Sequence, residues 1–156
     1  MTVDVSYAGY GYNTTVDTND DGMLVNLSIV KGKGTFGHSD ISITVEFEEP
    51  VSGDDPCAET YTWLPIVSGD GHYWASVLTA ANHSQLFSVF DQGYLCLNES
   101  PPFDYYGMAS GIYYGGTGCF EHAQGQWTSH FEGVNLDESI GYRSIRGTIE
   151  GQLELP

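Results

Sequence analysis

Three polar side chains in this sequence are candidates for proton transfer, namely Asp91, His130 and Glu132. Each lies in a stretch whose alternating apolar and polar residues predict a β-strand. Asp91 has the same alternation phase as Phe87, so we expect its side chain to face the apolar side near a strand end. A carboxylate in apolar surroundings holds its proton more tightly than in water and can act as a general acid or base. The competing interpretation is a turn cap, because Gly93 follows two residues later.

Two further charged residues on predicted strands are interpreted as surface groups. Glu46 shares a face with Thr44 in the alternating segment 41–48, which predicts a solvent-facing carboxylate. Arg146 alternates with Ile145, which favours a surface ion pair over an anion-binding position inside the fold.

Aromatic residues on the predicted strands supply the wall of a candidate ligand site. Such side chains hold an apolar molecule by contact and exclude water from it. The competing interpretation is that they fill the core, as in most small barrels. The predicted substrate-binding residues are Trp63, Tyr73, Trp74, Phe87, Tyr114 and Trp127.

One segment has the residue types of a half calcium-binding loop. Asp17, Asn19 and Asp21 are followed by Gly22, but Ser28 occupies the twelfth position, where a bidentate Glu is needed. The competing interpretation is a hairpin turn rich in turn-forming residues. The five histidines never occur at a spacing of two or four residues, so we predict no bound metal and no other cofactor.

Three cysteines, Cys57, Cys96 and Cys119, match no zinc-binding spacing. One disulfide with one free thiol is the preferred interpretation, and three reduced cysteines is the alternative. Cys57 follows Pro56 in a predicted loop, and Cys96 lies near a strand end. These positions are easier to bridge than that of Cys119, so we predict a disulfide between Cys57 and Cys96.

Asn-x-Ser/Thr sequons mark surface positions in secreted eukaryotic proteins. Three of them predict glycosylation at Asn13, Asn26 and Asn82, whereas a fourth, at Asn98, is followed by Pro101, which impairs modification. Together with the predicted disulfide, these sequons favour a secreted, extracellular protein.

Composition restricts the partners of the chain. Twenty-one Asp and Glu against 4 Lys and Arg give a net charge of −17 over 156 residues. Nucleic-acid binding requires cationic groups that neutralise phosphates, so nucleic acids and anionic membrane surfaces are excluded as partners. The apolar runs are also far shorter than the ~20 residues that cross a bilayer. The excess of acidic residues has two possible origins, secretion and a saline habitat, and the composition does not distinguish them.

The elements that position these residues are strands. Period-two alternation is clear in 41–48 and 145–155, and in 23–30 it places Leu27 and Ile29 on the predicted buried face. No window has a helical apolar stripe. We therefore expect one all-β domain, residues 1–156, of about eight to ten antiparallel strands without a long helix. The other strands are expected near 3–16, 60–67, 72–79, 85–91, 106–115 and 126–133.

Residues 115–125 read Gly-Gly-Thr-Gly-Cys-Phe-Glu-His-Ala-Gln-Gly. The segment resembles the Gly-Gly-Thr-Gly-x-Phe-x-x-Ala-x-Gly motif of dirigent proteins and the wider allene-oxide-cyclase-like barrels. The resemblance implies an eight-stranded antiparallel β-barrel with an apolar lumen, assembled as a homodimer or homotrimer. Glycines permit close backbone approach at a barrel corner, and Phe120 and Ala123 are expected to plug the barrel end. A phosphate-binding loop is excluded because no Lys and no helix follow the glycines.

Two function classes follow from this resemblance. The first is a barrel that binds an apolar small molecule and steers its cyclisation or coupling without a cofactor, as a cyclase or isomerase does. The alternative is a secreted binding or structural barrel without catalysis. A wide aromatic cavity with an ionisable group favours the first class, and a lumen filled by its own side chains favours the second.

Overall fold

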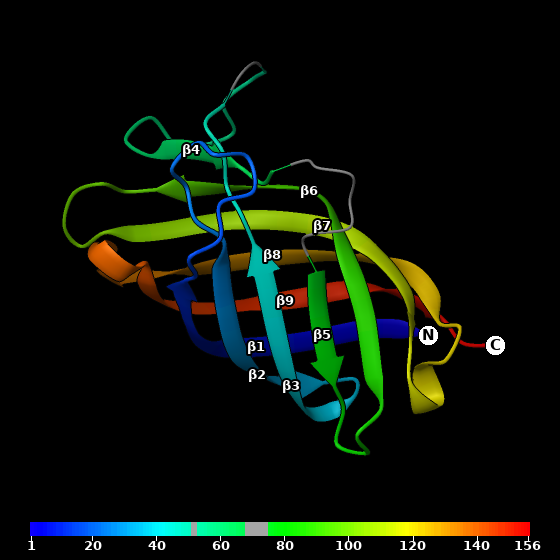
Figure 1. The fold of residues 1–156 in the computed structure, drawn as a ribbon. Helices are drawn as coiled ribbons and strands as arrows, with labels where there is room; N and C mark the ends of the chain where they lie inside the picture. The colour runs from blue at the N-terminus through cyan, green and yellow to red at the C-terminus, as the bar shows by residue number, and fades with distance from the viewer. Residues whose placement is uncertain (51–52, 68–74) are drawn as a thin grey trace.

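The computed structural model describes residues 1–50, 53–67 and 75–156, and this part of the chain is an all-β structure (Figure 1). Its nine strands form one antiparallel sheet. The strands are β1 (Thr2–Asn13), β2 (Asn26–Gly34), β3 (Gly37–Val45), β4 (Thr62–Pro65), β5 (Ala75–Thr79), β6 (Gln85–Leu97), β7 (Asp104–Gly116), β8 (Gln124–Asp137) and β9 (Tyr142–Glu154). Two short 3₁₀ helices, η1 (Gly118–Phe120) and η2 (Glu138–Ile140), precede β8 and β9.

The sheet closes into a barrel because β6 is long enough to pair on both of its edges. Residues 85–89 of β6 pair with β5, and its other edge pairs with β7. Residues 94–97 of β6 pair with β4, which is an extra strand outside the barrel. The predicted eight-stranded antiparallel barrel is therefore confirmed, with β4 added to it. The two chain ends lie at the same end of the barrel, where the Met1 amino group donates to the Leu153 carbonyl.

Alternation in β3 and β9 predicts the inward face correctly. Ile41 and Val45 are buried in β3, and Leu153 is fully buried in β9. Ile145 and Ile149 of β9 point into the same interior. Period-two burial of apolar side chains thus sets the register of these two strands.

In β2 the predicted face is wrong. Leu27 and Ile29 are exposed, whereas Asn26 and Ser28 are buried. Residues directly opposite each other in a sheet share a face, and Ile29 lies opposite the exposed Tyr10 of β1. Alternation therefore separates two faces, but the pairing with β1 decides which of them is inside.

The glycine motif closes one end of the barrel, as expected. Phe120 and Ala123 are buried, and Phe120 packs edge-to-face on Phe36 from the β2–β3 turn, with ring centroids 5.2 Å apart. A Cβ atom on Gly116 would lie 2.8 Å from the Cβ of Phe120 and 1.9 Å from the Gln85 carbonyl oxygen. Only glycine therefore allows this approach.

The predicted disulfide is confirmed. Cys57 and Cys96 are bonded with a Cα–Cα distance of 5.5 Å, and Cys119 is a free, exposed thiol. The bond ties the loop before β4 to β6, the strand with which β4 pairs.

Candidate functional site

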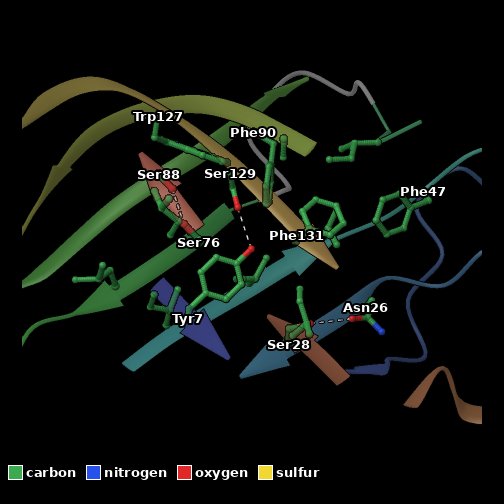
Figure 2. A pocket seen from close by; sticks show the side chains of 18 of the residues that line it. Tyr7, Asn26, Ser28, Phe47, Ser76, Ser88, Phe90, Trp127, Ser129 and Phe131 are labelled. Atoms are coloured by element: carbon green, nitrogen blue, oxygen red, sulfur yellow. Dashed lines mark hydrogen bonds between the residues drawn. The ribbon is translucent and has the colours of Figure 1, made fainter. Parts of the chain in front are cut away.

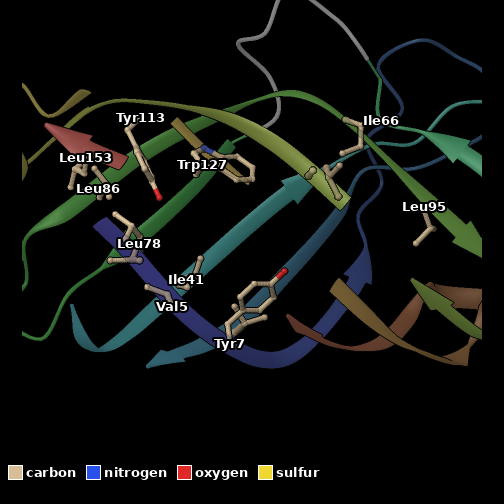
Figure 3. Close-up of a cluster of buried hydrophobic side chains, with 14 of the residues drawn as sticks. Val5, Tyr7, Ile41, Ile66, Leu78, Leu86, Leu95, Tyr113, Trp127 and Leu153 are labelled. Carbon is tan, nitrogen blue, oxygen red and sulfur yellow. The ribbon is translucent and has the colours of Figure 1, made fainter. Parts of the chain in front are cut away.

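The interior of the barrel contains a cavity of about 70 Å³ (Figure 2). Its lining is mostly apolar and aromatic and comes from residues that alternate along the barrel strands. Figure 3 shows Tyr7, Tyr113 and Trp127 among the buried side chains of this interior. The polar lining residues are Tyr7, Asn26, Ser28, Ser76, Ser88, Tyr105, Tyr113, Ser129 and Arg143.

Aromatic rings of the wall lie over glycines of the neighbouring strands. A Cβ atom on Gly111 would lie 2.6 Å from Cζ2 of Trp127, and one on Gly107 would lie 2.6 Å from Cζ of Phe131. Since glycine has no side chain, each ring lies against the barrel wall instead of crossing the lumen. The glycines of β7 therefore help to keep the centre of the barrel open.

The hydroxyl groups inside the barrel are hydrogen-bonded in pairs. The Tyr7 and Ser129 hydroxyls are 2.9 Å apart, and those of Ser76 and Ser88 are 2.5 Å apart (Figure 2). Ser28 donates to the Asn26 side-chain oxygen over 3.2 Å. Such pairing satisfies the hydrogen-bonding groups of these buried hydroxyls.

Burial keeps the interior phenols neutral. Desolvation raises the pKa of Tyr7 to about 12, although its hydrogen bond with Ser129 opposes the shift. Desolvation also raises the pKa values of Tyr105 and Tyr113. At neutral pH these phenols therefore act as hydrogen-bonding groups and not as bases.

The stability of the protein is expected to fall as the pH rises above about 10. An unfolded Tyr7 loses its proton near pH 10 but the folded one only near 12, so the unfolded state binds fewer protons in this window. Between about pH 9 and 11.5 the Tyr7 contribution amounts to about 2 kcal/mol. Urea unfolding across this range should show a smaller loss in Tyr7→Phe. The exposed Tyr12→Phe is the control, and equal losses in the two variants would contradict the assignment.

Arg143 is the one charged residue among the described lining residues. Its guanidinium lies 5.7 Å from the centre of the Tyr105 ring, and its Nε atom is buried without a hydrogen-bond partner. Desolvation lowers the pKa of Arg143 from its ordinary value. Sequence reasoning missed this residue and weighed Arg146 instead, which forms the expected surface ion pair with Glu132, at 2.8 Å.

The candidate catalytic residues lie outside the barrel. Asp91, His130 and Glu132 are exposed, so none of them faces the cavity. The expected orientation of Asp91 is wrong because Phe87, whose alternation phase it shares, faces outward, whereas Leu86, Ser88 and Phe90 line the cavity. Phe90 faces the interior in its place.

Of the predicted binding residues, Trp127 lines the cavity. Phe87 and Tyr114 contact each other on the outer face, with ring centroids 6.0 Å apart, and Trp63 lies on the outer strand β4. Tyr73 and Trp74 fall outside the described residues. The lining aromatics that sequence reasoning missed are Tyr7, Phe47, Tyr105, Tyr113 and Phe131. Tyr7 has the same alternation phase as the apolar Val3 and Val5, and this pattern could have predicted that Tyr7 faces the interior.

One predicted glycosylation position is not at the surface. Asn26 is 2% exposed, and its amide nitrogen is the donor of hydrogen bonds to Asn13 and to the Gly141 carbonyl. The surface position expected for this sequon is therefore wrong. Asn13 is half-buried and Asn82 is exposed.

Glu46 is also buried, which corrects its expected exposure. The segment that follows β1 covers it, and both the amide and the hydroxyl of Thr18 donate to its carboxylate. Carboxylate oxygens of Asp17, Asp21 and Glu46 lie within 4.8 Å of one another. Asp17 accepts hydrogen bonds from the amides of Asp21 and Gly22, as the turn interpretation expects.

Among the residues that the structure describes, no helix has the length and apolarity required to cross a membrane. Comparison of the chain with models of protein families, with characterised proteins and with solved structures found no match.

Proposed function

We propose that the protein binds a small, largely apolar molecule inside the barrel. The cavity itself carries this proposal, because protein cores contain few voids larger than a water molecule. Leaving about 70 Å³ empty costs about 1–2 kcal/mol, at roughly 24 cal/mol per Å³. Larger side chains at Ala109 or Ser88 would fill the cavity and remove that cost. A ligand that occupies the cavity explains why these two lining residues are small.

Unpartnered donors support the same proposal. The Nε1 atom of Trp127 and the Nε atom of Arg143 are buried without hydrogen-bond partners, and both residues line the cavity. Buried donors are usually satisfied, so a ligand with an acceptor atom accounts for them. Ligand pockets usually measure about 300–1,000 Å³, so a ligand of more than a few atoms requires lining side chains to move.

The described lining residues include no carboxylate and no imidazole. A cyclisation or coupling steered in this cavity would therefore depend on shape and not on acid–base chemistry. For this reason we propose the binding barrel, without catalysis, as the primary function.

Filling the cavity should abolish binding. Ala109→Leu adds three carbon atoms on the cavity side of β7, and it should keep or raise stability while binding of 1-hexanol is lost. Isothermal titration calorimetry and thermal unfolding measure the two effects. Ser110→Leu, on the outer face of the same strand, and Asp91→Asn should bind 1-hexanol as the unmodified protein does. Unchanged binding in Ala109→Leu would place the ligand elsewhere.

We further propose that the protein acts in an oxidising, extracellular compartment. The Cys57–Cys96 disulfide supports this location, because disulfides are rare in the cytosol. Expression with a secretory leader should give a protein with one alkylatable thiol, Cys119, whereas cytosolic expression should give three. The same thiol count from both routes would remove this support.

A further inference from the structure

We propose that Arg143 binds the carboxylate of the ligand, so that the cavity takes an organic anion with an apolar body. This inference rests on the proposed function and names the chemical class of the ligand. It starts from a charged side chain in the barrel wall that has no counter-charge among the residues that the structure describes.

The lack of a counter-charge is unexpected in so acidic a chain. Acidic residues outnumber Lys and Arg by 21 to 4. Lys31 forms an ion pair with Asp40, Arg146 forms one with Glu132, and Lys33 is exposed to solvent. Among the described residues, no carboxylate lies within 4.0 Å of the Arg143 guanidinium. Its partner is therefore expected to come from outside the chain.

The donors of Arg143 are also free. A guanidinium has five N–H groups arranged to bind a carboxylate in a bidentate manner. Within the described part of the chain, the Arg143 side chain makes no hydrogen bond, and its Nε atom is buried. The guanidinium carbon lies over the Tyr105 ring, 5.7 Å from its centroid, an arrangement that uses none of the N–H donors.

Backbone pairing brings polar groups together in this part of the cavity. Arg143 of β9 lies opposite Gly11 of β1, and Gly11 lies opposite Ser28 of β2. Gly11 has no side chain, so nothing from β1 separates Arg143 from Ser28 in this row. Farther along β9, Ile145 and Ile149 line the cavity. The ligand carboxylate would therefore lie at Arg143, with the apolar body beside these isoleucines.

Acids and alcohols of equal chain length test this inference. Butanoate, hexanoate and octanoate are titrated by calorimetry beside 1-butanol, 1-hexanol and 1-octanol. In a purely apolar cavity the alcohols bind more tightly, because burying an unpaired carboxylate is costly. With Arg143 as partner, we expect the best-fitting carboxylate to bind at least about tenfold more tightly than its alcohol.

A matched pair of variants locates the effect. Arg143→Met keeps the length of the side chain and removes a half-buried charge without a described partner, so it should fold with equal or higher thermal stability. We expect it to lose the preference for the carboxylate while it still binds the alcohol. Arg146→Met, which removes the surface arginine three residues away, should keep the preference.

The outcomes separate this inference from the proposed function. Alcohols that bind as tightly as the acids, or a carboxylate preference that survives in Arg143→Met, would overturn the role of Arg143 and leave the binding barrel intact. If neither series binds to the unmodified protein, the proposed function fails with it. The comparison of acid and alcohol on the unmodified protein does not depend on how either variant folds.

Discussion

Replacing Trp127 with alanine is expected to lower the free energy of unfolding by about 3–5 kcal/mol. The side chain is 6% exposed and packs edge-to-face on Phe90, with ring centroids 5.3 Å apart. Its ring also covers Gly111, which has no side chain to fill the space left behind. The loss therefore combines apolar transfer with a larger cavity. Urea unfolding monitored by circular dichroism measures it.

Trp127→Phe is the matched control, because it keeps an aromatic ring beside Phe90 and should cost about 1–2 kcal/mol. Added indole should raise the melting temperature of Trp127→Ala more than that of the unmodified protein, since the larger apolar cavity of the variant accepts an aromatic guest. A loss below about 1 kcal/mol in Trp127→Ala would mean that the indole is not packed core.

Removing the disulfide is expected to lower stability by about 4 kcal/mol. Cys57 and Cys96 are 39 residues apart, and closing a loop of this length removes roughly that much chain entropy from the unfolded state, expressed at 25 °C. The variant Cys57→Ser with Cys96→Ala avoids a buried hydroxyl at position 96, which is fully buried. Urea unfolding of this variant measures the loss.

Cys119→Ser is the control for the disulfide variant and should unfold as the unmodified protein does, because Cys119 is exposed and unbonded. Dithiothreitol should destabilise the unmodified protein and Cys119→Ser alike, and it should not affect the variant without the disulfide. Equal stability with and without the Cys57–Cys96 bond would show that the loop before β4 is held by packing instead.

The sequence by itself determined the all-β class and the inward faces of two strands. In β3 from Ile41 to Val45 and in β9 from Ile145 to Leu153, every second residue is apolar or glycine, and only one face can be buried. The Cys57–Cys96 pairing was also predictable, because one cysteine lies in a loop and the other near a strand end. These inferences depend on local pattern alone, which explains their success.

Only the tertiary structure decided what faces the cavity. Asn26 and Ser28 point inward because β1 sets the register of β2, although Leu27 and Ile29 are the apolar residues. Asp91 points outward because it shares the alternation phase of Phe87, and the closed barrel places Leu86, Ser88 and Phe90 of β6 inside instead.

The surroundings of the charged residues also depend on the tertiary structure. Glu46 is buried because a segment distant in sequence covers it, through the hydrogen bonds of Thr18. Arg143 lines the cavity and Arg146 does not, since their side chains point to opposite faces of β9. Strand alternation places the two arginines on opposite faces of β9. Only the closure of the barrel makes one of these faces an interior, whose described lining residues include no carboxylate to pair with Arg143.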